Sequence, residues 1–185
     1  VLTLDDAVVR DTSGQEMDGA HGIGLGVEGA SARVARGILG RNRVVGVYAT
    51  GAGTMLALED AVVRDTLAQT SDGAHGRGLV VQVGARASAV RVLFEHNREV
   101  AVFAGGTGAT LTLADTTVRD TLPQESDGEH GVGLGVELAS VEGARLLLDA
   151  GRQVTGTAGD YQVNGARTYG TLNIGGSLGT VVSFV

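Results

Sequence analysis

Short runs in which apolar and polar residues alternate follow one another along the chain, separated by glycine-rich turns. Residues 56–58, 78–83 and 111–113 alternate in the way expected of half-buried strands. Residues 51–53 and 105–108 carry the turn signals between such runs. No window keeps the apolar spacing of an amphipathic helix without an interrupting glycine. The pattern therefore predicts an all-β chain.

One long motif occurs three times. It consists of V-R-D-T, a polar stretch and D-G-x-H-G-x-G-L, and its copies begin at Val9, Val63 and Val118. Asp11 and Asp65 are 54 residues apart, and Asp65 and Asp120 are 55 residues apart. A period of this length is typical of stacked repeats, in which each unit buries its apolar face on the next.

A shorter period lies inside the long one. Small residues align at steps of 22, 32, 23 and 32 residues, at Gly24, Gly46, Gly78, Ala101 and Gly133. Coils of about 22 residues therefore alternate with coils that carry a polar insert of about ten residues. The inserts are Ser13 to Gly22, Leu67 to Gly76 and Leu122 to Gly131. We expect a right-handed parallel β-helix, or solenoid, with three short strands in each coil.

The composition narrows the classes of partner and the organisation of the chain. The net charge is −7, every basic residue is Arg and no basic run occurs, so a nucleic-acid partner is not expected. There is no Cys, no apolar stretch of membrane-spanning length and no visible signal peptide. The repeats predict one domain over residues 1–156, followed by a divergent, strand-rich segment over residues 157–185 that caps the stack or docks on another subunit.

One recurring corner is expected to form a column of polar side chains along the stack. The predicted column contains Asp11, Asn42, Asp65, Asn97 and Asp120. Stacked amides and carboxylates at a repeated turn bond to backbone groups, so we interpret the column as a structural ladder. A row of catalytic carboxylates is the alternative, with aspartates separated by roughly 9–10 Å across two coils. A neighbouring cationic column is expected at Arg10, Arg41, Arg64, His96 and Arg119.

The D-G-x-H segments of the inserts are the clearest chemical signal. In one interpretation each Asp accepts backbone N–H bonds in an Asx turn, the next residue (Gly19, Gly73 or Gly128) has a positive φ, and no cofactor is bound. In the other interpretation a divalent metal is held by the Asp and His side chains. The residues concerned are Asp18, His21, Asp72, His75, Asp127 and His130.

The repeated segments allow a comparison with a known family. The glycine-rich runs Gly22 to Ala30 and Gly76 to Ala85, the runs Val34 to Val44 and Val90 to Val100, and the V-R-D-T motif resemble right-handed parallel β-helix repeat proteins of bacterial surfaces, in the pectin-lyase-like class. The resemblance covers roughly residues 1–156 and implies a secreted or cell-surface protein. That class contains lyases and hydrolases of polysaccharides beside adhesins and structural proteins.

Two functions are therefore expected as alternatives. The first is a non-enzymatic structural module or adhesin, whose partner is a second copy of the chain, joined head to tail. The second is a lyase or hydrolase with an acidic face that acts on a surface polysaccharide. Near-identical repeats favour the first, because an active site usually breaks a repeat at one place. Residues expected at the ends that self-associate are Val1, Leu2, Leu4, Tyr169, Leu172, Ile174 and Phe184.

Overall fold

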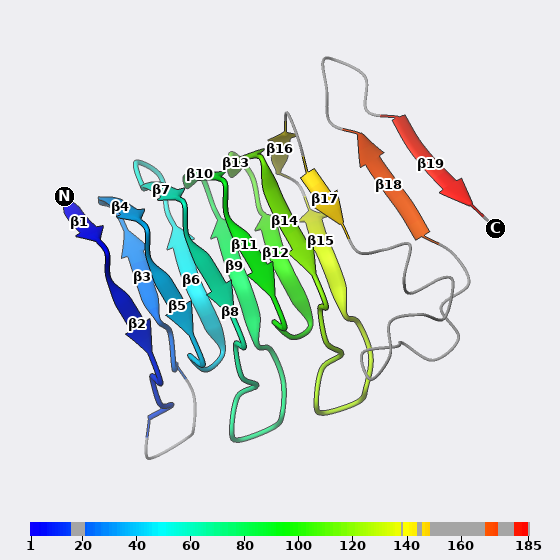
Figure 1. The fold of residues 1–185 in the computed structure, drawn as a ribbon, viewed down its shortest axis with the longest axis horizontal. Coiled ribbons are helices and arrows are strands. Elements are labelled where there is room, and N and C mark those ends of the chain that lie inside the picture. Colours follow the sequence, from blue (N-terminus) through cyan, green and yellow to red (C-terminus); the bar gives the residue numbers. More distant parts are fainter. Residues whose placement is uncertain (16–20, 138, 144–145, 149–168, 174–179, 185) are drawn as a thin grey trace.

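The computed structural model describes residues 1–15, 21–137, 139–143, 146–148, 169–173 and 180–184 (Figure 1). These residues form strands joined by turns and loops, and none of them is helical. Within this part of the chain there is consequently no helix of the length and hydropathy needed to span a membrane. The prediction of an all-β chain is confirmed for the described residues.

Three parallel sheets account for all but two of the described strands. Sheet A contains β1 (Leu2–Asp5), β4 (Ser31–Ala35), β7 (Met55–Glu59), β10 (Arg86–Val90), β13 (Thr110–Ala114) and β16 (Ser140–Gly143). Sheet B contains β2 (Val8–Arg10), β5 (Ile38–Gly40), β8 (Val62–Arg64), β11 (Leu93–Glu95), β14 (Thr116–Arg119) and β17 (Leu146–Leu148). Sheet C contains β3 (Leu25–Glu28), β6 (Val45–Thr50), β9 (Arg77–Gln82), β12 (Val100–Gly105) and β15 (Val132–Glu137).

The strands visit the sheets in a fixed order, A then B then C, and each strand pairs with its equivalent in the next round. We call each such set of three strands a coil, so that β1 to β3 form the first coil and β13 to β15 the fifth. Figure 1 shows the coils stacked side by side in the order of the sequence. This arrangement is consistent with a parallel β-helix, or solenoid.

The pairing in sheet C confirms the spacing expected from the sequence. Leu25 pairs with Val47, and the pairing continues through Leu79 and Val102 to Leu134, which gives steps of 22, 32, 23 and 32 residues. The insert itself is shorter than the ten residues expected. Gly46 follows Arg41 by five residues in the second coil, whereas Gly78 follows the equivalent Asp65 by thirteen residues in the third coil. The insert is therefore eight residues long. The other two extra residues lie in the turn from sheet C to sheet A.

The eight-residue insert of the third coil is expected to be dispensable for folding. Removing residues 68–75 leaves five positions between Asp65 and Gly78, as in the second coil, so the flanking strands can pair unchanged. Shortening a loop whose ends are fixed costs little conformational free energy. We expect cooperative thermal unfolding of the deletion variant, with a loss of no more than about 2 kcal/mol. Non-cooperative melting would show that the insert is part of the core.

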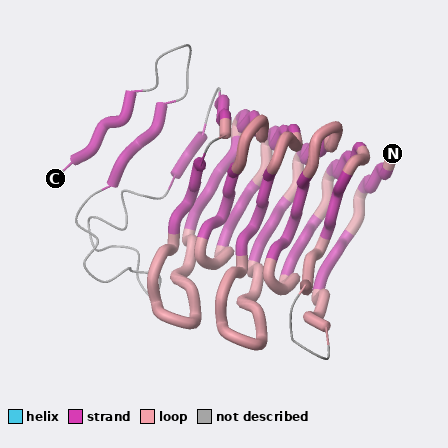
Figure 2. The backbone as a smooth tube through the Cα atoms, turned by 180° about the vertical axis from the view of Figure 1, so that it is seen from behind, coloured by secondary structure: helices cyan, strands magenta, loops and turns pink. Residues whose placement is uncertain are grey.

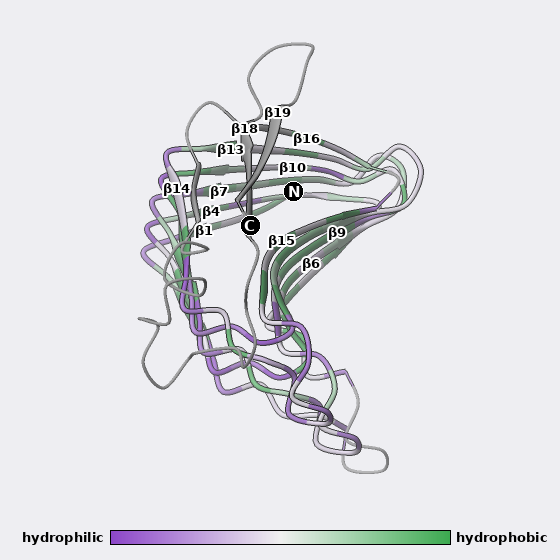
Figure 3. Cartoon of the chain, turned by 90° about the vertical axis from the view of Figure 1, so that its right-hand side faces the viewer, coloured by the Kyte–Doolittle hydropathy of each residue, from purple (hydrophilic) through white to green (hydrophobic). Residues whose placement is uncertain are grey.

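The core is built from columns of equivalent side chains that run along the stack. Leu58, Val47, Leu79, Val81 and Phe94 are fully buried between the sheets. Viewed along the stack, apolar residues concentrate on the strands of the three sheets, and hydrophilic residues on the loops (Figure 3). Buried residues from all five coils belong to a single hydrophobic cluster, so the stack shares one continuous core.

The corners between sheets use left-handed backbone at non-glycine positions. The corner from A to B has φ between 49° and 54°, at Asp6, Arg36, Asp60, Arg91 and Asp115. The corner from B to C has φ between 51° and 59°, at Asp11, Arg41, Asp65, His96 and Asp120. Asp tolerates this conformation better than Arg, so the arginines need compensating contacts to occupy it.

The C-terminal segment departs from parallel stacking. β18 (Tyr169–Asn173) and β19 (Thr180–Phe184) pair with each other in antiparallel register. The parallel strands extend to Leu148, and the expected domain boundary at residue 156 lies outside the described residues. The prediction that this segment caps the stack or docks on another subunit is not tested by the pairing.

Candidate functional site

The polar corner column differs from the expected one by a single position. In sheet B, Arg10 pairs with Gly40 and Gly40 pairs with Arg64. Continuing one residue further places Arg41, not Asn42, between Asp11 and Asp65. The observed columns are Asp11, Arg41, Asp65, His96, Asp120 and, next to it, Thr12, Asn42, Thr66, Asn97, Thr121. The expected ladder of Asp and Asn and the expected column of Arg and His were therefore both wrong in register.

The Thr and Asn column is the buried polar ladder of the molecule. Asn97 is 0% exposed, and its amide oxygen accepts from the Thr66 hydroxyl at 2.7 Å and from the Thr66 N–H at 3.3 Å. Its amide nitrogen donates to the Val63 carbonyl at 2.9 Å. Asn42 repeats these contacts with Thr12 and with Val9, at somewhat longer distances. The two asparagines thus hold neighbouring coils together from inside, as the structural interpretation expected of them.

The aspartates instead alternate with basic residues on the outside of the same corner. Arg41 donates to both carboxylate oxygens of Asp11, at 2.7 and 2.8 Å. His96 lies between two aspartates, with Nδ1 3.4 Å from Asp65 and Nε2 3.8 Å from Asp120. Because acidic and basic residues alternate from coil to coil here, each aspartate has a basic side chain of a neighbouring coil as its partner.

The corner between sheets A and B repeats this alternation. Arg36 binds Asp6 through two hydrogen bonds of 2.7 Å. Arg91 binds Asp60 through hydrogen bonds of 2.5 and 2.7 Å. The hydrogen bonds from Arg36 and Arg91 lower the pKa of Asp6 and Asp60, respectively. We call each of these two columns, in which acidic and basic residues alternate at the left-handed corner positions, a charge ladder. One ladder lies at the corner between sheets A and B, and the other lies at the corner between sheets B and C.

The inserts adopt the turn that the first interpretation of D-G-x-H expected. Asp72 Oδ1 accepts the Ala74 N–H at 2.9 Å, and Asp127 Oδ1 accepts the Glu129 N–H at 2.8 Å. Gly73 has a φ of 70° in the first of these turns. Figures 1 and 2 show the inserts of the third and fifth coils projecting from the same edge of the stack. The segment around Asp18 and Gly19 lies outside the described residues.

Potential metal ligands come together in the fifth coil. Ligand atoms of Asp127, Glu129 and His130 lie within 4.8 Å of one another, and all three residues are exposed. The third coil does not repeat the group, because Ala74 occupies the place of Glu129 and His75 contacts Glu99. Exposed acidic groups often gather without a metal, so a metal at these loops stays a prediction.

One cluster that sequence reasoning missed interrupts the repeat. Arg77 donates to Glu99 through Nε at 2.9 Å and through its terminal nitrogen at 2.5 Å, and His75 Nδ1 lies 3.1 Å from the same carboxylate. The Arg77 guanidinium also lies 5.2 Å from the centre of the Phe103 ring. The places of Arg77 and Glu99 are taken by Val45 and Val44 in the second coil. In the sequence, the cluster is marked by these two charged residues at positions where the second coil has valines.

The Glu99 cluster predicts a specific pH dependence of the protein's stability. Burial alone would raise the pKa of Glu99, but the hydrogen bonds from His75 and Arg77 outweigh it and lower the pKa to about 2. A carboxyl whose pKa is lower in the folded state stabilises fully above its unfolded value near 4.5, and this stabilisation is lost as the pH falls towards 2.

Comparing the wild type with Glu99→Gln isolates this contribution. The other carboxylates are present in both proteins, so their titration cancels in the difference. We expect the stability advantage of the wild type to shrink by on the order of 2–3 kcal/mol between pH 5 and pH 2, measured by urea denaturation at several pH values. A difference that does not change with pH would show that Glu99 is not held by these donors.

Residues expected to self-associate lie partly within the described region. Leu2 occupies the inward-facing column of Ala32 and Leu56, yet it is 43% exposed, because β1 is the first strand of sheet A. Val1 is fully exposed and Leu4 is partly buried. Tyr169, Leu172 and Phe184 belong to β18 and β19, and Ile174 lies outside the described residues.

Comparison of the chain with models of known families, with curated proteins and with solved structures gave no match.

Proposed function

We propose that this chain is a non-enzymatic structural module, a right-handed parallel β-helix that serves as a rigid repeat scaffold and associates end to end. The observation that carries the proposal is the commitment of the corner charges to contacts between coils. Asp6 with Arg36, Asp11 with Arg41 and Asp60 with Arg91 each form a two-bond ion pair across one coil spacing. These groups are occupied in holding the stack, and a catalytic role would need them available.

The charge ladders support the scaffold in a second way, through register. Exposed ion pairs contribute only about 0–1 kcal/mol each, so the ladders are a small part of the total stability. A slip by one whole coil, however, would bring Asp onto Asp in both ladders, Arg36 onto Arg91 in one and Arg41 onto His96 in the other. We propose that the alternation selects the correct order of coils during folding.

End-to-end association is supported by an apolar side chain at the edge of the first coil. Leu2 belongs to an inward-facing column of sheet A, yet it is exposed there. A further coil supplied by a second copy would cover Leu2 and pair with β1 and β2. A secreted or cell-surface location is also proposed, and it rests on the resemblance of the repeats alone.

Sedimentation velocity over a wide range of protein concentration tests this association. We expect the sedimentation coefficient to rise with concentration, and electron microscopy of the concentrated sample to show particles longer than one stack. Leu2→Asp should restore the monomer because it places a charge in the shared core. Met55→Asp is the matched control, since Met55 is 56% exposed on the outer face of β7 and away from the end. A wild type that stays monomeric at every concentration would rule out this part of the proposal.

An enzyme acting on polysaccharides is the second candidate, favoured by the His75, Arg77 and Glu99 cluster because it breaks the repeat. Glu99 is poorly suited to general acid catalysis, since its pKa is about 2 and both carboxylate oxygens accept hydrogen bonds. Incubation with acidic and neutral polysaccharides, followed by assays for reducing ends and for unsaturated products, separates the two candidates. Product formation that Glu99→Gln abolishes would favour the enzyme.

A further inference from the structure

The outer face of sheet B contains a column of charged residues in which one member is missing. Arg10, Gly40, Arg64, Glu95 and Arg119 are paired in register along β2, β5, β8, β11 and β14. Glu95 lies between two arginines in the fourth coil. Gly40 occupies the same place between two arginines in the second coil, and it has no side chain.

Glu95 shows what a carboxylate does at this place. It is 8% exposed, and Arg119 donates to its Oε2 through Nε at 3.0 Å and through a terminal nitrogen at 2.5 Å. At the same time, Nε of Arg119 lies 3.9 Å from Oδ2 of Asp120, the next residue in the sequence. A sequence-adjacent aspartate therefore does not prevent an arginine of this column from binding a second carboxylate.

The surroundings of Gly40 repeat this arrangement without the carboxylate. Arg10 lies 3.6 Å from Asp11, and Arg64 lies 3.7 Å from Asp65. Both distances exceed a hydrogen bond, and neither guanidinium donates a hydrogen bond to a carboxylate within the described residues. Asp11 is already bound by Arg41. Two arginines thus face the place of Gly40 with donors to spare.

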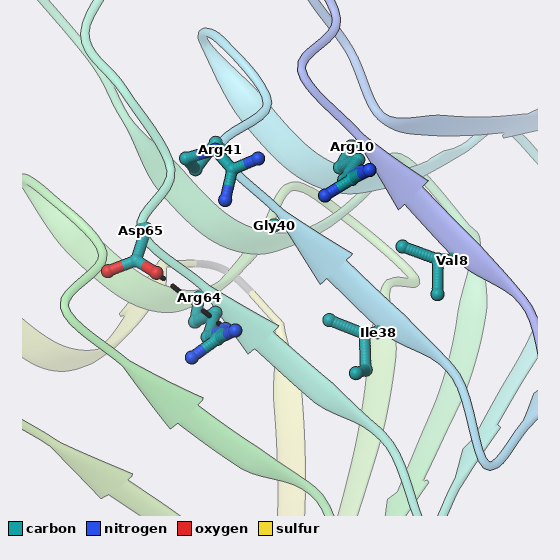
Figure 4. A pocket seen from close by; sticks show the side chains of 7 residues that line it. All are labelled: Val8, Arg10, Ile38, Gly40, Arg41, Arg64 and Asp65. Carbon is teal, nitrogen blue, oxygen red and sulfur yellow. Dashed lines mark ion pairs between the residues drawn. The ribbon is translucent and has the colours of Figure 1, made fainter.

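A hollow occupies this place. It has a volume of about 510 Å³, and its lining residues are Val8, Arg10, Ile38, Gly40, Arg41, Arg64 and Asp65. Figure 4 shows Arg10 and Arg64 on the strands that flank the strand of Gly40, with Val8 further along the strand of Arg10 and Ile38 further along the strand of Gly40. The volume is in the range of small-molecule sites. Three arginines and the carboxylate of Asp65 stand at one end of the hollow, and exposed aliphatic side chains stand at the other.

We propose that this hollow binds a carboxylate carried on a short aliphatic stem, seated beside Gly40 between Arg10 and Arg64, at the place in the column where, two coils further on, Arg119 binds Glu95. The guanidinium groups bind the carboxylate by charge-assisted hydrogen bonds, and Val8 and Ile38 contact the stem. The arginines are well exposed, so the dissociation constant is expected to be about 1–10 mM. This ligand site does not depend on the proposed scaffold function.

Arginine side-chain NMR tests the site directly. Glutarate is titrated into ¹⁵N-labelled protein, and the Nε–Hε signals are followed, with glutaramide as the neutral control. We expect saturable shifts at Arg10 and Arg64 with glutarate only, and no matching shift at Arg33, which Glu59 already binds. A parallel titration with the peptide Gly-Glu-Gly shows whether a free acid or a glutamyl residue binds more tightly.

Substitutions at the equivalent places provide matched controls. Gly40→Glu supplies the carboxylate from the chain and should weaken glutarate binding at least tenfold. Gly40→Ala should bind as the wild type does, because the added Cβ lies 3.7 Å from its nearest neighbour. Glu95→Gly should open a second site and make Arg119 respond. The proposal is overturned if neither ligand gives saturable shifts, if all arginines shift alike, or if Gly40→Glu binds as tightly as the wild type.

Discussion

Asn97→Ala is expected to lower the free energy of unfolding by about 3 kcal/mol. The substitution removes three buried hydrogen bonds, two from Thr66 and one to the Val63 carbonyl. Each buried group left without a partner costs about 1–3 kcal/mol, and Asn97 is 0% exposed. Asn97→Asp should cost more still at neutral pH, because it sets a carboxylate against the Val63 carbonyl.

Urea denaturation at pH 7 measures this loss. Asp65→Asn is the matched control one residue from Thr66, and its effect should stay within about 0.5–1 kcal/mol because Asp65 belongs to the exposed charge ladder. Asn42→Ala should fall between the two, since its hydrogen bonds are longer. Equal denaturation midpoints for Asn97→Ala and the wild type would place Asn97 outside the buried ladder.

Gly78→Ala is expected to destabilise the protein by about 3 kcal/mol or more. A Cβ at Gly78 would lie 2.4 Å from the Ala101 carbonyl oxygen and 2.9 Å from the Asn97 amide nitrogen. The first of these atoms is backbone within sheet C, so relief requires the coils to move apart at the point where the Asn97 ladder joins them. Overpacking of a core usually costs about 1–3 kcal/mol, and contact with backbone lies at the upper end.

The loss of stability in Gly78→Ala should come from the lack of space at this position, and not from replacing a glycine as such. Gly40→Ala adds the same methyl group where the nearest atom is 3.7 Å away, and its denaturation midpoint should match the wild type within error. Gly24→Ala meets the Gly46 carbonyl oxygen at 2.5 Å and should resemble Gly78→Ala. If Gly78→Ala and Gly40→Ala unfold at the same urea concentration, the coils are not packed as closely as the structure shows.

The sequence predicted the architecture because small residues mark the close approach between coils. Gly24, Gly46 and Gly78 stand where a Cβ would meet the next coil or the ladder amides, and their spacing therefore gave the coil lengths correctly. The length of the insert was overestimated for a physical reason. The two further residues of the third coil lie in the turn between β6 and β7. The spacing within sheet C alone cannot separate them from the insert.

The side-chain columns were harder to predict than the fold. The expected column placed Asn42 beside Asp65 because the two side chains are chemically similar. In the structure Gly40 pairs with Arg64, and this register places Arg41 beside Asp65. In the charge ladders, Asp alternates with Arg or His from coil to coil, so chemically dissimilar residues stack on one another.

The candidate sites follow from this register. With the columns aligned as observed, Gly40 falls opposite Arg64 and Arg77 opposite Val45, and each then stands out as an exception within its column. Without the register, both positions look like ordinary variation between repeats. The ligand hollow and the Glu99 cluster are therefore visible only after the strands have been paired.

The central claim is that Thr and Asn stack inside the corner while Asp and Arg or His stack outside it. Nuclear Overhauser effects from the side-chain amide protons of Asn97 test this register most directly. The structure predicts strong effects to Thr66 and Val63, together with slow exchange of the Asn97 amide protons with solvent. Fast exchange of these protons, with effects to Asp65 in place of Thr66, would contradict the register and the account built on it.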